Sequence, residues 1–569
     1  MKLDLNLIAA KILLVGLFFV TIAITPWNNL EPTVLPKLFV FVLTTCFAGI
    51  LVLIGIKKSH GSTTLLVLTV SSFLIILLSI VNNPKFISER IFGITGRNVG
   101  AIILFSVFLF LFIAQFCIGS LSSKQIVYTF KLGSSVVVTY FFMQTLDWDP
   151  AKWNNEFSGI PSSTLGNPNF VSAFVAMSVS GSLPLIVDLG TRWIEKSVLV
   201  VVGLAEVVVL IMTDNIQGLS IVFSCMLILL LVKIRTLVFR LFVRKTFILI
   251  AILFSFFFLY RSSFSTFFLN RIMSESSIRA RIDYWQAGLS MIEANPLFGV
   301  GLDYFGDSYL IFRSDEAANR AAGVFSDSAH NYFIDIGAFG GVILLACYTI
   351  PSIMVIIKLN SILYTQIRTS DRGGVPISSS SSFLGCILIW LGFLMQSMIN
   401  PINLALLYSG CFLTSYLATS LRVFVPKRRL VEDDDRKPKL SNSLTERPRV
   451  WLIKLLLIPI TSVFPILSIQ PMLVDAKFRN AMEQGNGDEI YRISLREPRS
   501  YQRMEYAARI FIENDRVDLA IQILRTMVRD SPDNVRGWKL IATYSPYESE
   551  RLSAMEWMRL KDPKNPDLK

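Results

Sequence analysis

Long apolar runs separated by short polar segments dominate the first 470 residues of the chain. Each run is close to the roughly 20 residues that a helix needs to cross the apolar core of a bilayer. We therefore expect about thirteen spanning helices, predicted by the runs 9–25, 35–56, 63–81, 99–119, 125–145, 168–188, 197–213, 217–232, 245–261, 331–357, 382–399, 404–421 and 450–469. The pattern is typical of an all-α polytopic membrane protein.

Basic residues cluster in the short segments between these runs and indicate an orientation. With the N-terminus in the cytoplasm, clusters such as Lys57-Lys58, Lys124 and Lys427-Arg428-Arg429 all lie on the cytoplasmic side, as the positive-inside rule requires. This orientation leaves a large loop, about 262–330, and the segment 470–569 outside. We therefore expect a multi-pass membrane protein with these two segments on the external side.

Composition supports this picture and excludes several classes of function. The chain is 53% hydrophobic and 17% charged, and its net charge of +13 lies mostly in the loop clusters. We therefore predict membrane lipid around the chain and no nucleic-acid partner. The six cysteines lie inside apolar runs without CxxC spacing, so we predict neither a disulfide framework nor a metal site, and no cofactor.

The C-terminal part of the chain differs in kind from the apolar runs. We divide the protein into a membrane domain (1–421), a charged cytoplasmic linker (422–449), a last span (450–469) and a tail (470–569). The tail has amphipathic helical periodicity, and Pro498 and Pro532 stand one tetratricopeptide period of 34 residues apart. Its pattern resembles a helical repeat, which leaves open a groove for a protein partner or a cap that packs on the membrane domain.

The large external loop contains an amphipathic helix and several basic residues. Residues 276–294 predict a helix with Ile278, Trp285 and Leu289 on one face, ended by Asn295-Pro296. External arginines run against the orientation rule and indicate an anionic ligand, with an ordinary soluble surface as the alternative. They are Arg90, Arg97, Arg271, Arg279, Arg281, Arg313 and Arg320.

Only two histidines are present, and they lie at opposite sides of the predicted membrane. His60 falls in a cytoplasmic loop, whereas His330 stands where the external loop enters the run 331–357. A neutral histidine can accept a proton near pH 7. Asp327 and Asn331 beside it are candidate positioning residues, although helix capping explains both equally well.

At these residues the chain resembles a known family. The segments "NPLFGVGLDYF" and "SAHNYFIDIGAFGGVILL", with "GRNVG" at 96–100 and "TLGNPNFVSAF" at 164–174, are similar to the O-antigen ligase and O-antigen polymerase superfamily. That superfamily also includes bacterial protein O-oligosaccharyltransferases. The glycines at 299, 301 and 306 do not follow nucleotide-binding spacing, and no strand pattern precedes them.

The resemblance implies a bacterial plasma-membrane protein with its active site on the external, or periplasmic, side. There it would transfer a glycan from an undecaprenyl diphosphate carrier to an acceptor hydroxyl. A departing diphosphate needs positive charge, which Arg279 or Arg281 would supply first and Arg97 second. His330 would be the general base. We thus expect a metal-independent glycosyltransferase, with Asn167 at an external helix end as a further positioning candidate.

The sequence leaves the acceptor open. It can be lipid A-core in a ligase, a growing glycan in a polymerase, or a protein in an oligosaccharyltransferase; a flippase for the lipid-linked glycan is a more distant alternative. In the family many members carry an arginine in a T-x-S-R-G turn, where this chain has "TDNIQG" with Gln217. The role of that arginine is then absent or belongs to a neighbour, and Gln217 is a further candidate positioning residue.

Overall fold

The computed structural model describes residues 4–25, 32–55, 62–82, 87–149, 156–157, 159–233, 276–320, 324–369, 380–423 and 446–568. In this part of the chain the only strands are β1 (Glu156–Phe157) and β2 (Ile160–Pro161), which form one short antiparallel pair. All other regular structure is helical. The chain is therefore an all-α polytopic protein, as predicted.

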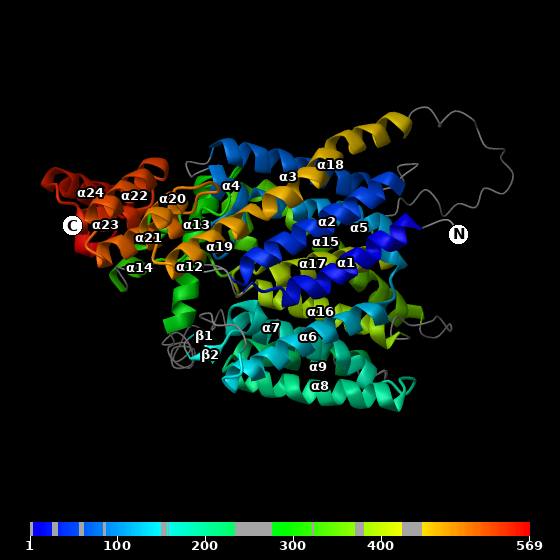
Figure 1. The fold of residues 1–569 in the computed structure, drawn as a ribbon. Helices are drawn as coiled ribbons and strands as arrows, with labels where there is room; N and C mark the ends of the chain where they lie inside the picture. Colours follow the sequence, from blue (N-terminus) through cyan, green and yellow to red (C-terminus); the bar gives the residue numbers. More distant parts are fainter. Residues whose placement is uncertain are drawn as a thin grey trace, which may run out of the picture.

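Apolar helices form an elongated bundle (Figure 1). They are α1 (Leu5–Ile22), α2 (Val34–Gly55), α3 (Thr63–Asn82), α5 (Ala101–Cys117), α6 (Ser123–Thr145), α7 (Pro168–Ile186), α8 (Trp193–Met212), α9 (Ile216–Lys233), α15 (Tyr332–Thr369), α16 (Ser381–Ser397), α17 (Leu404–Ser420) and α18 (Glu446–Ser468).

Eight helical stretches in the described part of the chain are long and apolar enough to cross a membrane. Three shorter apolar helices, Ile216–Leu230, Ser381–Ser397 and Leu404–Ser420, match three further predicted spans. Helix α8 covers the predicted span 197–213, but it is not among the eight. The predicted span 245–261 lies outside the described residues, as do His60, Arg271 and residues 424–445 of the predicted linker.

Helix α5 forms the centre of the bundle because it has no polar face. Its sequence AIILFSVFLFLFIAQFC is apolar all round, and nearly every residue is buried. Tyr408 of α17 joins the surrounding helices: its ring meets Phe41 of α2 and Phe110 of α5 edge-on, and its hydroxyl donates to the Leu13 carbonyl at 2.9 Å. Aromatic packing and a satisfied hydroxyl thus fix α1, α2, α5 and α17 together.

Shorter helices gather with the tail at one end of the bundle, opposite the N-terminus (Figure 1). They are α4 (Ile87–Phe92), α12 (Ser276–Ala294), α13 (Phe305–Phe312) and α14 (Asp315–Arg320). The tail consists of α19 (Gln470–Glu483), α20 (Gly487–Ser494), α21 (Tyr501–Glu513), α22 (Val517–Asp530), α23 (Val535–Tyr544) and α24 (Glu548–Lys561). Single 3-10 turns occur at η1 (Ile118–Ser120), η2 (Ser163–Leu165) and η6 (Pro566–Leu568).

Helix α12 confirms the predicted helix 276–294. Leu289, on the apolar face that the sequence predicts, is 56% exposed, whereas Ala287 and Met291 are fully buried. The small residues decide the contact, because Gly288 lies against Ile334 of α15 and a larger side chain there would collide with it. The helix packs through its small residues rather than along its most apolar stripe.

Candidate functional site

His330 lies in the turn that leads into α15, at the end of the bundle where the tail sits. Its backbone φ is +53°, a left-handed conformation, and its N–H donates to Ser328 Oγ at 2.8 Å. The imidazole stacks on the ring of Tyr284 from α12, with centroids 5.6 Å apart and planes inclined by 29°. The backbone turn and the tyrosine together fix the direction of the ring.

The two glycine segments of the sequence signature pack against each other and bring α12 to His330. Val300 N–H donates to the Ala338 carbonyl and Val342 N–H to the Pro296 carbonyl, each at 2.8 Å. Gly341 has φ +69°, and a Cβ on it would lie 2.4 Å from the Pro296 carbonyl oxygen. Only glycine permits this backbone contact. The signature thus forms a structural joint, in which residues 296–300 pack against residues 338–342 of α15. It does not form a nucleotide-binding loop.

Arg97 is buried at the centre of a carboxylate cluster beside this joint. Its guanidinium lies 3.3 Å from Asp335, 3.7 Å from Asp327 and 3.9 Å from Asp303, and it also donates to the Asp327 carbonyl. Burial disfavours its charge, but these three carboxylates outweigh burial and raise the pKa of Arg97 above its ordinary value. Arg97 is therefore charged and already held by protein groups.

Asp335 connects this cluster to His330. One oxygen accepts from the Ala329 N–H at 2.8 Å, and the other accepts from Ser328 Oγ at 2.8 Å and from Arg97. Ser328 in turn accepts from the His330 N–H. Asp303 fixes the other side of Arg97, since its carboxylate accepts from the Ile94 N–H at 2.7 Å. Backbone amides near Arg97 are therefore engaged by a carboxylate of the protein itself.

Arg281 of α12 is the cation that faces His330 without a carboxylate partner. In the described part of the chain no carboxylate lies within 4.0 Å of its guanidinium, and its buried Nε has no hydrogen-bond partner. Burial lowers the pKa of Arg281. Burial first, and then the charges of Arg281 and Arg97, lower the pKa of His330 to about 4 against the pull of Asp327. At pH 7 the imidazole is neutral.

The other arginines that the sequence predicts to be external differ in their contacts. Arg313 is 1% exposed and pairs with Asp562 of the tail at 2.7 Å, Arg320 pairs with Asp283, and Arg90 donates to the Ile80 carbonyl. Arg279 is exposed on α12. Of the two arginines preferred from the sequence, Arg281 is the one beside His330.

The remaining predicted positioning residues have local roles. Asn331 caps α15, accepting from the N–H of Phe333 at 3.0 Å, and Asn167 caps α7. Gln217 is buried in the first turn of α9. Asp327 contacts Arg97, and no hydrogen bond joins its carboxylate to the His330 ring among the described residues. Among the described residues no contact brings Asn167 or Gln217 to His330.

Several residues of the site did not stand out in the sequence. Asp335, Asp303 and Ser328 are single polar residues within or beside apolar runs, and Tyr284 reads as a membrane-surface aromatic. A carboxylate one turn inside a predicted span was the one available signal, because its burial requires a partner. In the described ranges no group of three or more His, Cys, Asp or Glu side chains is arranged to hold a metal ion.

Comparison with known proteins finds a family match over the part of the chain that contains this site. Residues 199–349 match the family model described as O-antigen ligase. The match includes Arg281, Tyr284, His330 and Asp335, and it supports glycan transfer of the O-antigen ligase kind at a coarse level. No curated protein matches the chain. The family match covers about a quarter of the chain and supports the resemblance to the O-antigen ligase superfamily that the sequence motifs indicate.

Proposed function

We propose that the protein transfers a glycan from an undecaprenyl diphosphate-linked donor to an acceptor hydroxyl at the outer face of a bacterial plasma membrane. The observation that carries the proposal is the juxtaposition of a neutral His330 with Arg281, a cation that has no carboxylate partner among the described residues. A proton acceptor and an anion-binding group are the two parts that this transfer needs. Both lie in the family-matched segment.

The proposed step is a single displacement. The acceptor oxygen forms a bond to the anomeric carbon while the bond from that carbon to the diphosphate oxygen breaks, and the electron pair leaves with the diphosphate. His330 takes the hydroxyl proton. Arg281 binds the diphosphate and stabilises the charge that develops on it. Such a displacement inverts the anomeric centre, and it needs no metal ion.

Donor binding would also prepare the base. A histidine with a pKa of about 4 is a weak proton acceptor, and part of that lowering comes from Arg281. A bound diphosphate offsets the charge of Arg281 and adds negative charge nearby, so it raises the pKa of His330 toward neutrality. The imidazole thus becomes a better base only when a donor is in place.

Arg97 has a different role in this proposal from the one expected from the sequence. Its guanidinium is taken up by Asp335, Asp327 and Asp303, so it is poorly placed to bind a diphosphate directly. We assign it as a positioning residue for the turn that carries His330. Arg279, exposed one half-turn before Arg281, is the second cation that a long donor headgroup would meet.

The acceptor distinguishes ligase, polymerase and protein oligosaccharyltransferase, and the site geometry is common to all three. Lipid A-core ligation is the first choice because the family match is to the ligase model. A test uses a strain deleted for the gene and complemented with wild type or His330→Asn at equal membrane levels. Asparagine tolerates left-handed φ better than most residues, so its failure reports on the imidazole.

Three surface profiles separate the alternatives in that strain. Loss of capped lipid A-core with long donor chains still present means ligase, loss of the long chains means polymerase, and loss of a protein-bound glycan alone means oligosaccharyltransferase. A flippase predicts that lipid-linked glycan remains on the cytoplasmic side. Wild-type activity that disappears with a chelator and returns with a divalent cation contradicts the metal-independent mechanism.

A further inference from the structure

The turn between α22 and α23 of the tail touches both loops that surround His330. Tyr304, which precedes α13, donates its hydroxyl to Asp533, and the guanidinium of Arg536 lies 4.4 Å from the centre of the Phe325 ring. Asp533 also pairs with Lys561 of α24 at 2.5 Å. Asp533 in this turn and Arg536 in the first turn of α23 therefore contact two segments that are separated by more than 20 residues in the sequence.

The first of these contacts leads directly to the carboxylate cluster. Tyr304 is 6% exposed and follows Asp303, the carboxylate that holds the Ile94 and Val99 amides and lies beside Arg97. Fixing the Tyr304 ring from the tail therefore fixes the backbone from which Asp303 projects. The 93–99 loop and Arg97 depend on that placement.

The second contact leads to the histidine. Phe325 precedes Ser326, which donates to the Ser328 carbonyl at 2.7 Å, and Ser328 accepts from the His330 N–H. Four residues separate Phe325 from His330, and they have no regular secondary structure. Irregular segments open at low free energy unless other contacts hold them. Arg536 supplies one such contact from the tail.

Two further attachments hold the tail against the same region. Arg313 at the end of α13 pairs with Asp562 at 2.7 Å, both nearly fully buried, and Lys564 donates to the Arg313 carbonyl at 2.6 Å. On the other side Glu89 of α4 accepts from the Tyr501 N–H at 3.0 Å, at the N-terminus of α21, where a carboxylate is favoured by the helix dipole.

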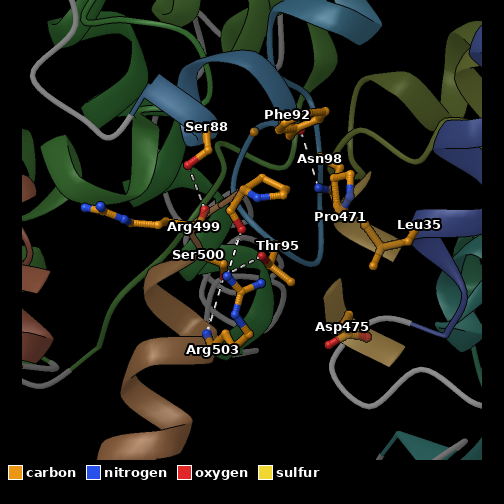
Figure 2. Close-up of a pocket in the computed structure, with 12 residues that line it drawn as sticks. Leu35, Ser88, Phe92, Thr95, Asn98, Pro471, Asp475, Arg499, Ser500 and Arg503 are labelled. Carbon is orange, nitrogen blue, oxygen red and sulfur yellow. Dashed lines mark hydrogen bonds between the residues drawn. The ribbon is translucent and has the colours of Figure 1, made fainter. Parts of the chain in front are cut away.

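Figure 2 shows the interface beside this second attachment. Ser88 donates to the Arg499 carbonyl at 2.9 Å, and the hydroxyls of Thr95 and Ser500 lie 2.7 Å apart. Thr95 stands two residues before Arg97 in the loop that Asp303 holds. The tail therefore meets the site loops at Thr95, Tyr304 and Phe325.

We propose that the tail is a positioning element of the transferase site, with Asp533 and Arg536 as positioning residues that hold the Asp303 and His330 loops in register. The inference rests on the proposed function. Arg281 and Tyr284 lie on α12, which is joined to α15 through the glycine contact and not through the tail. Loosening the tail turn should therefore reduce turnover more than donor binding.

The test uses the full chain in lipid nanodiscs, comparing the double variant Asp533→Asn/Arg536→Met with Arg525→Met. Arg525 is the matched control, since it pairs with Glu550 and lies 5.7 Å from the Tyr547 ring, all within the tail. Hydrogen exchange followed by mass spectrometry reports on peptides with residues 93–99 and 325–330. Glycan transfer and binding of undecaprenyl diphosphate are measured on the same samples.

We expect exchange in both peptides to rise at least tenfold in the double variant and to stay unchanged in Arg525→Met. The kcat should fall about tenfold to a hundredfold, as for a site displaced by a fraction of an ångström, with the Kd for undecaprenyl diphosphate within twofold of wild type. The variant Asp533→Asn/Arg536→Lys, which keeps a cation over Phe325, should have a higher kcat than the Asp533→Asn/Arg536→Met variant.

Three outcomes overturn different parts of this account. Unchanged exchange and unchanged kcat in the double variant, with an active wild type, overturn the positioning role and leave the proposed function standing. A wild type that neither binds undecaprenyl diphosphate nor transfers glycan overturns the proposed function, and with it the positioning role. A fall in kcat equal to that of Arg525→Met means that the tail acts on stability alone and also overturns the inference.

Discussion

Two buried ion clusters in this protein have opposite characters. Near the tail, Arg97 meets three carboxylates, and Arg281 stands close to His330 without a carboxylate of its own among the described residues. Within the bundle, Lys131 of α6 pairs with Glu206 of α8 at 2.5 Å, and Ser178 and Ser182 of α7 complete their hydrogen bonds. We call the first cluster unbalanced, because its positive and negative groups are not all paired with each other. We call the second closed, because its one acid and one base pair with each other.

This difference distinguishes a functional site from an ion pair that only stabilises the fold. A closed pair of one acid and one base satisfies its own charge, so it offers nothing to a ligand and costs much if one partner is removed. An unbalanced cluster beside a neutral histidine is the arrangement that functional sites show. Glu206, the buried carboxylate that a transporter would use at mid-membrane, belongs to the closed kind. Mutations in the two clusters should therefore change different observables.

Replacing His330 should have the largest effect on activity. His330→Asn removes the proton acceptor and keeps a residue that tolerates the left-handed turn, so kcat should fall by about 10²–10⁴ with donor binding retained. Turnover and the Kd for undecaprenyl diphosphate, measured on one nanodisc preparation, check this. Full activity in His330→Asn would remove the general base from the mechanism.

Arg281→Gln should lower kcat/KM by about 10²–10³, because the diphosphate loses its principal counter-charge. The acid limb of the pH profile should also move. Wild-type kcat/KM needs neutral His330 and falls as the pH drops toward about 4. Arg281, Arg97, Asp327 and Tyr284 face the imidazole, and burial remains the larger cause of its lowered pKa. Losing Arg281 raises that pKa, so the limb should shift to higher pH.

The exposed neighbour provides the control for this prediction. Arg279→Gln removes an equal charge two residues away on the solvent side of α12. It should change kcat/KM less than tenfold and leave the acid limb in place. Equal losses in the two variants would mean that both arginines bind the donor, and the assignment of Arg281 alone would be wrong.

The sequence predicts the helices and two residues of the site, but it does not predict which residues contact one another. Apolar run length predicted the eight long apolar helices and the three shorter ones of the described residues. Helix periodicity with Asn295-Pro296 predicted α12 to the residue. The sequence also indicated His330 and Arg281. It could not assign partners: Arg97 lies more than 200 residues from the three aspartates that hold it. Nor could it show that Gly341 is required by a backbone contact with Pro296.

For the same reason the sequence does not distinguish a tail that caps the membrane domain from a tail that offers a groove to a protein partner. Its amphipathic period identifies helices, but not the surface on which they pack. Asp533, Arg536 and Asp562 are ordinary surface charges in the sequence. Only three-dimensional proximity gives them Tyr304, Phe325 and Arg313 as partners. The tetratricopeptide character of the tail stays a prediction.

Asp335→Asn should have an intermediate effect. The amide keeps the size of the side chain but loses the charge that faces Arg97, and its nitrogen cannot accept from Ser328 or Ala329. We expect kcat to fall roughly tenfold, in the range of a displaced catalytic group, with donor binding close to wild type. The kcat and KM measured separately check this, and a change in KM alone would place Asp335 in donor binding instead.

The closed pair should give the smallest effect on activity and a large effect on stability. Glu206→Gln or Lys131→Met alone leaves a buried charge and should destabilise the fold by about 3–5 kcal/mol. The double variant should recover most of that loss, and all three should keep wild-type kcat once folded. Thermal unfolding in nanodiscs and transfer assays on the folded fraction check both parts. If Glu206→Gln is stable yet abolishes movement of the lipid-linked glycan across the membrane, the transporter alternative replaces the transferase, because a mid-membrane carboxylate would then carry the function.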